Sequence, residues 1–453
     1  MSSVPGGTPA ALHLALYVTE TGAQLGAWRH PLAGDVPALD WRFYRDLARQ
    51  AEAACIDFVF LADKLAIDDV YGASFEATVQ SRAMPQHAEP LSIMAALAGA
   101  TERIGLAGTV SATYADPYAT ARALATIDHL SGGRVGWNLV TSVSDSEARN
   151  FGRERHLDHD ARYRKAEEFA QLLRKLWDSW GDGWRLADRA SGQYADPGRL
   201  RYVDHAGEWF RVRGPLNVPR PPQGHPVQIQ AGVSGNFQRT AAQAAEVIFA
   251  VQPDLARAQA FYADFKQRLA ALGRDPDSLK ILPGLVPVIG ATPREARDLA
   301  RELREKVLPR AALSFISASM NHDLSQYALH EPVPDIASRV TGSKGRFEAA
   351  LRQAREQGLT LAEFGVGYAQ SLSFFSPFGT AAEVADQIAT WHQGRACDGF
   401  VVLPAIMPSG AQAFLSEVVP ELQSRGIFRT AYPGRTLRDT LGLARPADGF
   451  WRG

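Results

Sequence analysis

The chain has 453 residues, of which 46% are hydrophobic, so it is long enough to bury a large core. Its 48 basic and 49 acidic side chains leave a formal net charge of −1, which argues against a nucleic-acid or anionic-membrane surface. No window approaches the roughly 18 apolar residues of a membrane span, and no signal peptide is visible, so we expect a cytoplasmic protein. Cys55 and Cys397 sit among apolar neighbours, and we expect both to be buried, reduced thiols.

Short apolar runs recur along the chain and alternate with amphipathic helical patterns. Eight of these runs predict β-strands, at residues 12–18, 57–61, 104–110, 134–140, 227–230, 247–251, 281–289 and 399–403. Helical patterns lie between most of them, at residues 40–55, 90–100, 117–130, 163–180, 236–245, 255–272, 293–307, 346–356 and 380–393. Strand–helix alternation favours a parallel sheet, and eight repeats favour an α/β fold closed as a (β/α)8 TIM barrel.

Two connections are far longer than one crossover helix requires. We interpret them as insertions after strands 4 and 7, at about residues 142–225 and 309–378. Alternating apolar positions within residues 196–215 predict a β-hairpin in the first insertion. The second contains a polar, proline-broken segment, residues 315–335, which we interpret as a mobile lid over the barrel mouth. No internal repeat or linker is visible, so residues 1–453 are predicted to form a single domain with insertions.

Polar residues stand where predicted strands 2 to 5 end, which is the end of an α/β barrel that carries its chemistry. They are Asp63, Thr109, Asn138, Thr141 and Ser234. Each also has a structural explanation. Asp63 fits a helix cap, and the others fit hydrogen-bonding strand ends or turns.

Two further features near these strand ends suit a phosphate-bearing ligand. Gly232 and Gly235 leave backbone N–H groups open at the start of a predicted helix, which is a favourable phosphate site. His159 and Tyr163 lie one helical turn apart, so both can face the same ligand. His156 and His159 are also spaced for a metal ion. No third ligand block of familiar spacing accompanies them, and we assign no metal site.

Several blocks resemble one enzyme family in both sequence and order. They are FVFLAD at 58–63, SATYADPYATAR at 111–122, GGRVGWNLVTS at 132–142, EARNFG at 147–152, HLDHDARYRKAEEF at 156–169 and PVQIQAGVSG at 226–235. Through them the chain resembles the bacterial luciferase-like, flavin-dependent monooxygenases that include nitrilotriacetate monooxygenase, pristinamycin synthase and dibenzothiophene-sulfone monooxygenase. Residues 202–224 and 429–439 are most similar to the sulfone monooxygenase.

This resemblance implies the same barrel, with FMN bound in its reduced form, FMNH2. The family's flavin contacts correspond to Asp63, Thr109, His159, Tyr163 and Ser234. We expect Tyr163 and Ser234 near the phosphate, and Asp63 and Thr109 nearer the ring. The resemblance also implies a separate NAD(P)H:FMN reductase, O2 as co-substrate, and a homodimer or homotetramer. The expected substrate is a small organic molecule, with an aromatic sulfone or similar xenobiotic as the leading class and a C–S or C–N bond as the bond cleaved.

Substrate-contacting residues are expected at the same barrel mouth. Trp28 and His30 follow the first predicted strand, and His322 lies in the second insertion, where relatives place a histidine a few positions earlier. Three aromatic residues near strand ends suit a flat apolar pocket, although core packing explains them equally well: Tyr17, Phe60 and Phe249. No residue stands out as an indispensable acid or base, but His30 or His159 is a candidate to steer a proton.

The sequence leaves two alternatives to a flavin-dependent monooxygenase. No GxGxxG motif follows a predicted strand and opens a helix, so a nicotinamide-binding module is not evident and electrons must come from elsewhere. The same barrel could instead bind the deazaflavin F420 and transfer hydride, or bind a flavin without turnover. Fold alone does not separate these functions, because this barrel hosts many chemistries.

Overall fold

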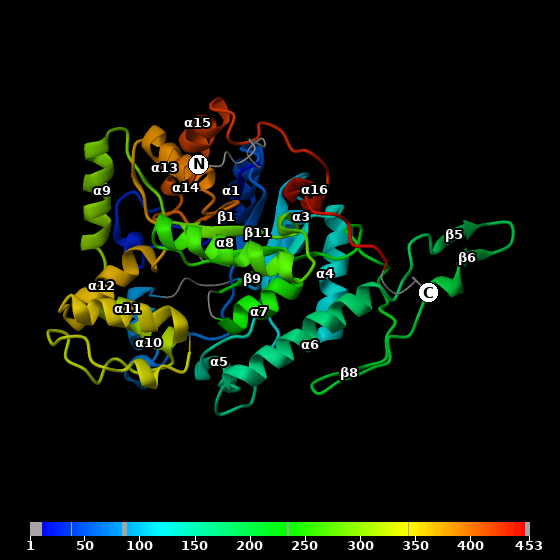
Figure 1. Ribbon diagram of the computed structural model, residues 1–453, viewed down its shortest axis with the longest axis horizontal. Helices are drawn as coiled ribbons and strands as arrows, with labels where there is room; N and C mark the ends of the chain where they lie inside the picture. Colours follow the sequence, from blue (N-terminus) through cyan, green and yellow to red (C-terminus); the bar gives the residue numbers. More distant parts are fainter. Residues whose placement is uncertain (1–10, 38, 84–87, 233–234, 343, 449–453) are drawn as a thin grey trace.

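The computed structural model describes residues 11–37, 39–83, 88–232, 235–342 and 344–448. Eight parallel strands close into a barrel in the order β1-β14-β11-β10-β9-β4-β3-β2 (Figure 1). They are β1 (His13–Tyr17), β2 (Phe58–Leu61), β3 (Gly105–Ser111), β4 (Val135–Val140), β9 (Val227–Ala231), β10 (Val247–Ala250), β11 (Lys280–Leu285) and β14 (Gly399–Val402). The predicted (β/α)8 barrel is confirmed, and every predicted strand overlaps one of these eight.

The seventh predicted strand consists of two separate strands. β11 ends at Leu285, and β12 (Val288–Ile289) pairs instead with β13 (Phe378–Gly379) in a small sheet outside the barrel. Between them, the Val286 amide donates a hydrogen bond to the Phe375 carbonyl (2.8 Å). The chain therefore leaves the barrel wall earlier than the continuous apolar run predicts.

The barrel interior is filled by side chains, and a C-terminal helix closes its floor. Alternate residues of the strands, among them Phe58, Ala107 and Val401, form one interior cluster. The short helix α16 (Leu437–Leu441) adds Leu437 to this cluster. A Cβ atom at Gly105 would lie 2.6 Å from Leu437 Cδ1, so the close approach of α16 to β3 requires glycine there.

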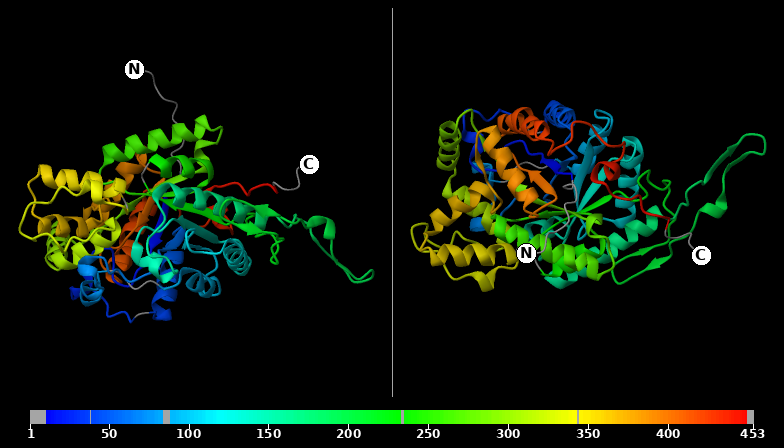
Figure 2. Two further views of the ribbon diagram at one scale, coloured as in Figure 1. Left: turned by 90° about the horizontal axis from the view of Figure 1, so that it is seen from below. Right: turned by 45° about the horizontal axis from the view of Figure 1, so that its top comes forward.

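Helices surround the barrel, and most follow the predicted ranges (Figure 2). They are α1 (Trp41–Ala53), α3 (Pro90–Ala98), α4 (Pro117–Ser131), α6 (His159–Trp177), α7 (Gly235–Ala244), α8 (Leu255–Ala271), α9 (Pro293–Glu305) and α13 (Ala381–Gln393). Several helices lie outside the predicted ranges, and the short ones among them include α2 (Glu76–Ser81), α14 (Ser409–Ala413) and α15 (Val419–Ser424). Helix α6 begins at His159 rather than at residue 163, because the Asp158 side chain caps it by accepting a hydrogen bond from the Ala161 amide (2.9 Å).

The first insertion contains α5 (Asp145–Asn150), α6 and an arm that extends away from the barrel (Figure 1). The arm carries two small hairpins, β5 (Arg185–Asp188) with β6 (Gln193–Ala195) and β7 (His205–Ala206) with β8 (Arg211–Val212). The hairpin predicted within residues 196–215 is confirmed as β7–β8, whereas the β5–β6 hairpin lies outside the prediction. At the base of the arm, buried Arg220 donates from Nε to Asp178 (2.9 Å), which ties the returning chain to the end of α6.

The second insertion is largely helical. Helices α10 (Pro309–Met320), α11 (Lys344–Glu356) and α12 (Leu361–Ser371) enclose an apolar core of their own, which includes Leu313, Ile316, Phe347, Leu361 and Phe364. Residues 315–320 of the segment interpreted as a mobile lid belong to α10. Leu313, Ile316 and Met320 recur at helical spacing and are fully buried, so packing overrides the polar character of the segment.

Among the described residues, every helix is too short or too polar to cross a membrane. Cys55 and Cys397 are both buried and are not joined in a disulfide, which agrees with the expectation for these two residues. Burial raises the pKa of the Cys397 thiol well above its usual range, so this side chain is unsuited to act as a thiolate nucleophile.

Candidate active site

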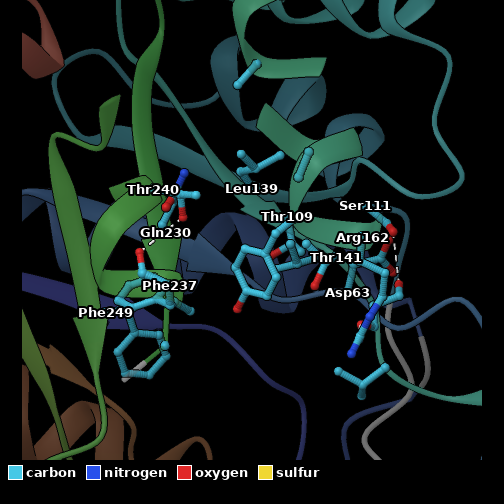
Figure 3. Close-up of a pocket in the computed structure, with 18 of the residues that line it drawn as sticks. Asp63, Thr109, Ser111, Leu139, Thr141, Arg162, Gln230, Phe237, Thr240 and Phe249 are labelled. Atoms are coloured by element: carbon cyan, nitrogen blue, oxygen red, sulfur yellow. Dashed lines mark hydrogen bonds between the residues drawn. The ribbon is translucent and has the colours of Figure 1, made fainter. Parts of the chain in front are cut away.

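A cavity of about 570 Å³ lies at the barrel mouth, where the C-terminal ends of β2, β3, β4, β9 and β10 meet α6, α7 and α10 (Figure 3). This volume falls within the range of about 300–1,000 Å³ that is usual for small-molecule sites. Six predicted site residues line the cavity: Asp63, Thr109, Thr141, His159, Tyr163 and Phe249. The fold therefore brings these side chains, which are widely separated in sequence, to one place.

Asp63 is half-buried at one side of the cavity, just after β2. Burial raises the pKa of its carboxyl group to about 6, and the carboxylates of Glu89 and Glu147 act in the same direction. A hydrogen bond from the Lys64 amide opposes this shift. Asp63 can therefore hold or release a proton close to neutral pH.

Thr109 and Asn138 form a buried pair beside the cavity. Asn138 donates from Nδ2 to Thr109 Oγ1 (3.1 Å), and the Thr109 hydroxyl donates to the Leu61 carbonyl (3.0 Å). Thr109 lines the cavity. Asn138 lies behind Thr109 and is not one of the described residues that line the cavity. Asn138 Oδ1 is buried without a hydrogen-bond partner among the described residues. The pair therefore leaves one buried polar atom unsatisfied next to the site.

The polar segment after β4 is fixed by two buried charged side chains. Glu147 closes a capping box at the start of α5 by accepting from the Ser144 amide (3.2 Å), and it also accepts from the Ser142 hydroxyl (2.9 Å). Arg162 on α6 is 3% exposed and donates to the Ser142 carbonyl (2.5 Å). Ser142 is held at a left-handed φ of 54° between these contacts. This turn places Thr141 against the cavity.

His159 and Tyr163 occupy adjacent positions on the cavity side of α6, with ring centroids 4.8 Å apart. Both belong to the first turns of the helix because α6 begins at His159. The sequence prediction that the two side chains face the same ligand is consistent with this placement.

The turn between β9 and α7 also borders the cavity. Gly232 lines it with a φ of 156°, and a Cβ atom there would lie 2.8 Å from the Phe237 ring. Glycine is therefore required for the backbone to pass between the ring and the cavity. Helix α7 begins at Gly235, which directs a helix N-terminus toward this region. The predicted residue Ser234 lies outside the described residues.

Aromatic side chains form an apolar wall opposite the charged side. Figure 3 shows Phe237 and Phe249 on one side of the cavity, with Asp63 and Arg162 on the other. Phe249 stacks on Phe374, with ring centroids 5.3 Å apart and an interplanar angle of 13°. The cavity therefore has an apolar half suited to a flat ring system.

Two of the predicted aromatic residues support this wall from behind. Tyr17 stacks on Phe60 at 5.8 Å, and Phe60 meets Phe249 edge-on at 5.7 Å. Neither Tyr17 nor Phe60 is among the described lining residues. Core packing, the alternative explanation for both, is therefore what the structure shows.

Three residues that were predicted to contact the substrate, Trp28, His30 and His322, are not among the described residues that line the cavity. Trp28 donates from Nε1 to the Ser81 carbonyl (3.0 Å), because the chain after β1 turns outward over α2. His30 is 7% exposed, and its Nε2 lies 3.1 Å from a carboxylate oxygen of Glu302 on α9. The interpretation of His30 as a proton-steering residue at the mouth is therefore not supported.

His322 follows α10, and its Nε2 lies 3.1 Å from the Tyr327 hydroxyl within the irregular part of the second insertion. Burial lowers the pKa of this histidine, which favours the neutral ring. The neighbouring α10 residues Phe315 and Ser319 line the cavity instead. The insertion thus reaches the site through α10 and Phe374 rather than through the predicted histidine.

The two histidines considered for a metal ion make other contacts. His156 Nδ1 lies 3.4 Å from the Tyr114 hydroxyl, and His159 Nδ1 lies 3.1 Å from an Asp160 carboxylate oxygen. In the part of the chain that the structure describes, no three His, Cys, Asp or Glu side chains are grouped to hold a metal ion.

Sequence reasoning missed several lining residues, including Arg162, Phe237, Phe315 and Phe374. Arg162 was detectable, because it stands three residues after His159 on the same face of α6. Phe315 and Phe374 come from the second insertion, and their contact with the mouth depends on tertiary packing that no local pattern encodes.

Comparisons with known proteins agree with this architecture. The family model described as luciferase-like monooxygenase matches residues 22–397. Dibenzothiophene-sulfone monooxygenase of Rhodococcus erythropolis is 44% identical over 427 residues, which cover 93% of this chain and 94% of that protein. Nitrilotriacetate monooxygenase component A of Aminobacter aminovorans is 42% identical, with 97% and 98% covered.

Solved structures give the same result. A riboflavin lyase crystallised with modified FMN and riboflavin superimposes with a TM-score of 0.86 at 30% identity, covering 96% of this chain and 97% of that one. An F420-dependent secondary alcohol dehydrogenase has a TM-score of 0.58 at 14% identity, covering 91% and 99%, and shares the fold alone. The chain therefore belongs to the luciferase-like monooxygenase family, and it is a flavin-dependent enzyme.

Proposed function

We propose that the enzyme binds FMN in its reduced form, FMNH2, and uses O2 to oxygenate a small neutral aromatic substrate, with aromatic sulfones as the leading class. The observation that carries this proposal is the division of the mouth cavity into two unlike ends. The aromatic side chains Phe237 and Phe249 lie at one end, and the charged side chains Asp63 and Arg162 lie at the other (Figure 3).

The described residues fit FMN at three points. The N-terminus of α7 and the Tyr163 side chain suit the phosphate, and the sequence adds Ser234 to this group. Thr109, with the unsatisfied Oδ1 atom of Asn138 behind it, suits the polar edge of the ring system. The stacked phenylalanines suit its flat face.

When bound, the reduced flavin supplies two electrons to O2, of which one atom enters the substrate and the other leaves as water. The contribution of the protein is positioning, exclusion of water and control of a proton. Phe249, Phe315 and Phe374 exclude water from the apolar half of the cavity. We propose that the Asp63 carboxyl group donates or accepts the proton that moves during the reaction, with His159 as the second candidate for this role.

The charges around the cavity support a neutral substrate over a polyanion. Each cation that lines the described part of the cavity already has a partner: Lys64 with Asp68, Arg162 with the Ser142 carbonyl, and Arg174 with Gln228. A polycarboxylate of the kind named for one relative would need cations that are not already engaged. An aromatic sulfone of the kind named for another needs mainly an apolar wall and a few donors.

We further propose that a separate NAD(P)H:FMN reductase supplies the reduced flavin, which would place the enzyme in the cytoplasm. The nitrilotriacetate monooxygenase that this chain resembles is named as one component of a larger system. Pristinamycin IIA synthase of Streptomyces pristinaespiralis likewise consists of separately named subunits. The absence of a dinucleotide-binding motif in this sequence supports the same separation of the reductase from the monooxygenase.

We also propose that the chain forms a single barrel domain with two insertions and assembles as a homodimer or homotetramer. The arm supports self-association, because it extends from the barrel and carries large apolar side chains that are about half exposed. They are Leu186 (49%), Tyr194 (61%) and Tyr202 (56%). Light scattering of the intact enzyme and of a Tyr194→Ser, Tyr202→Ser double variant tests this proposal. A purely monomeric wild type would contradict it.

An isotope experiment tests the reaction. The enzyme is loaded anaerobically with photoreduced FMN and then mixed with dibenzothiophene sulfone and isotopically labelled O2. The expected product contains one labelled oxygen atom and forms in wild type, but is largely lost in Phe374→Ala. Phe378→Ala, at a 48% exposed phenylalanine outside the site, is the matched control. A product whose oxygen comes from water would refute oxygenation, and turnover of nitrilotriacetate alone would refute the neutral-substrate assignment.

A further inference from the structure

Two hydroxyl groups and one carboxylate form a buried, hydrogen-bonded chain in the wall of the cavity, here called the Ser111–Glu147 chain. The Ser111 Oγ atom lies 2.9 Å from the Ser142 Oγ atom, and the Ser142 hydroxyl donates to Glu147 Oε1 (2.9 Å). Ser111, Ser142 and Glu147 all line the cavity, and they are 6%, 8% and 4% exposed. The chain therefore links the surface of the cavity to a buried acidic group.

Ser111 lies where the polar edge of the flavin ring is proposed to bind. It follows Thr109 by two positions on β3, so both side chains point to the same side of the strand. Figure 3 shows Ser111 on the same side of the cavity as Asp63 and Arg162. Among the described residues, Ser142 is the one hydrogen-bond partner of the Ser111 hydroxyl. The remaining bonding capacity of this hydroxyl is available to a ligand in the cavity.

Glu147 is held in its ionised form. Burial raises the pKa of its carboxyl group, but the Lys64 ammonium and hydrogen bonds from the Val143 and Ser144 amides outweigh burial, and the pKa is lowered. The Glu147 Oε2 atom also accepts from the Ser144 hydroxyl (3.2 Å). Because an ionised carboxylate can only accept hydrogen bonds, the Ser142 proton must point toward Glu147.

This direction fixes the role of Ser111. A serine hydroxyl carries one proton, and that of Ser142 is committed to Glu147. The bond between the two serines must therefore use the Ser111 proton, with Ser142 Oγ as its acceptor. Ser111 then has no proton left for the cavity and offers only lone pairs to a ligand. The negative charge of Glu147 at the far end of the chain strengthens Ser111 as an acceptor.

We propose that Ser111 selects reduced flavin by accepting a hydrogen bond from N5–H of the ring. The inference rests on the proposed function, because it requires the polar edge of the ring to lie beside Thr109. N5 carries a hydrogen atom in reduced flavin, whereas in oxidised flavin it is an acceptor. An acceptor that faces N5 therefore favours the reduced form and opposes the oxidised form. N3 carries a hydrogen atom in both forms, so a contact with N3 would not discriminate between them.

The test compares the affinities of the full-length enzyme for reduced and oxidised FMN, each measured by anaerobic titration. Ser111→Ala should lower the preference for the reduced form about tenfold. Since flavin reduction takes two electrons, the midpoint potential of bound FMN should fall by about 30 mV, measured by equilibration with a redox dye. Ser314→Ala is the matched control and should leave both values unchanged. Ser314 also belongs to a buried hydroxyl pair, with Thr78 (2.6 Å), but is not one of the described residues that line the cavity.

Glu147→Gln is a second variant, which reverses the chain without removing it. The Oε2 position receives three donors, the amides of Val143 and Ser144 and the Ser144 hydroxyl, so the glutamine oxygen is expected there. The glutamine amino group then donates to Ser142, which donates to Ser111 in turn, and Ser111 becomes a donor to the cavity. The potential of bound FMN should fall again. Loss of the carboxylate charge alone would instead favour the electron-rich reduced flavin and raise the potential.

Equal weakening of both redox forms in Ser111→Ala would overturn the inference, because it would place Ser111 at N3–H or at another group that the two forms share. An unchanged ratio of affinities in Ser111→Ala, or a raised potential in Glu147→Gln, would also overturn it. A similar shift in Ser314→Ala would do the same, since it would show a general effect of lost packing. Failure of wild type to bind either form of FMN would instead overturn the proposed function.

Discussion

Replacing Asp63 by asparagine is expected to stabilise the folded enzyme, and to do so more at pH 8 than at pH 5. The pKa of this carboxyl group is raised to about 6 by burial, whereas an unfolded chain would titrate it near 3.9. The folded state therefore binds this proton more tightly than the unfolded state does. Folding is favoured at low pH, and the cost of the buried carboxylate develops as the pH rises through about 4 to 6.

The difference between the pKa values of Asp63 in the folded and unfolded states corresponds to about 3 kcal/mol of unfolding free energy above pH 7, since one pKa unit is worth about 1.4 kcal/mol. Asp63 keeps some solvent access, which reduces the expected gain for Asp63→Asn to about 1–2 kcal/mol at pH 8. About half of that gain should remain at pH 5.

Urea unfolding of wild type and Asp63→Asn at the two pH values measures the gain. Asp35→Asn, at an exposed aspartate, controls for the loss of one negative charge. An equal gain at both pH values, or a loss of stability at pH 8, would refute the assignment of this titration to Asp63.

Three further variants test the site and the barrel floor. Tyr163→Phe should weaken FMNH2 binding about tenfold in an anaerobic titration, with little change in the rate of the chemical step. Unchanged affinity would count against the phosphate assignment. Gly232→Ala should lower the melting temperature and the flavin affinity, because the new Cβ atom meets the Phe237 ring in a backbone conformation that costs about 1–3 kcal/mol. Gly367→Ala, in open space on α12, should be neutral or slightly stabilising, and a similar loss in both variants would refute the steric argument. Leu437→Ala should destabilise the protein by about 2–5 kcal/mol in urea while leaving flavin affinity unchanged, and a parallel loss of affinity would show that floor and mouth are coupled.

The barrel was predictable because its strands are short, separate apolar runs with helical patterns between them. Apolar periodicity reports burial directly, so even the hairpin at β7–β8 was visible in the sequence. Helix α10 was not predicted because serines, among them Ser314 and Ser317, interrupt its buried face, and packing against α12 decides its structure.

The site was predictable where a residue follows a strand directly, as with Asp63, Thr109 and Thr141. It was not predictable where the chain turns away after the strand. Asp63 stands two residues after the end of β2, whereas His30 stands thirteen residues after the end of β1, beyond a 3-10 turn, and its side chain meets Glu302. The aromatic wall from the second insertion, including Phe374, depends on contacts between segments that are distant in sequence.

The order in which the barrel closes has a consequence for biosynthesis. His13 in β1 pairs with Gly399 in β14, so the first strand finds one of its two neighbours only after nearly the whole chain has left the ribosome. Until then β1 presents an open edge beside β2, and unpaired edges of this kind invite association with other chains. Leu437 fills the floor later still. Heterologous production should therefore depend on slow synthesis or chaperone supply more than the stability of the finished barrel would suggest.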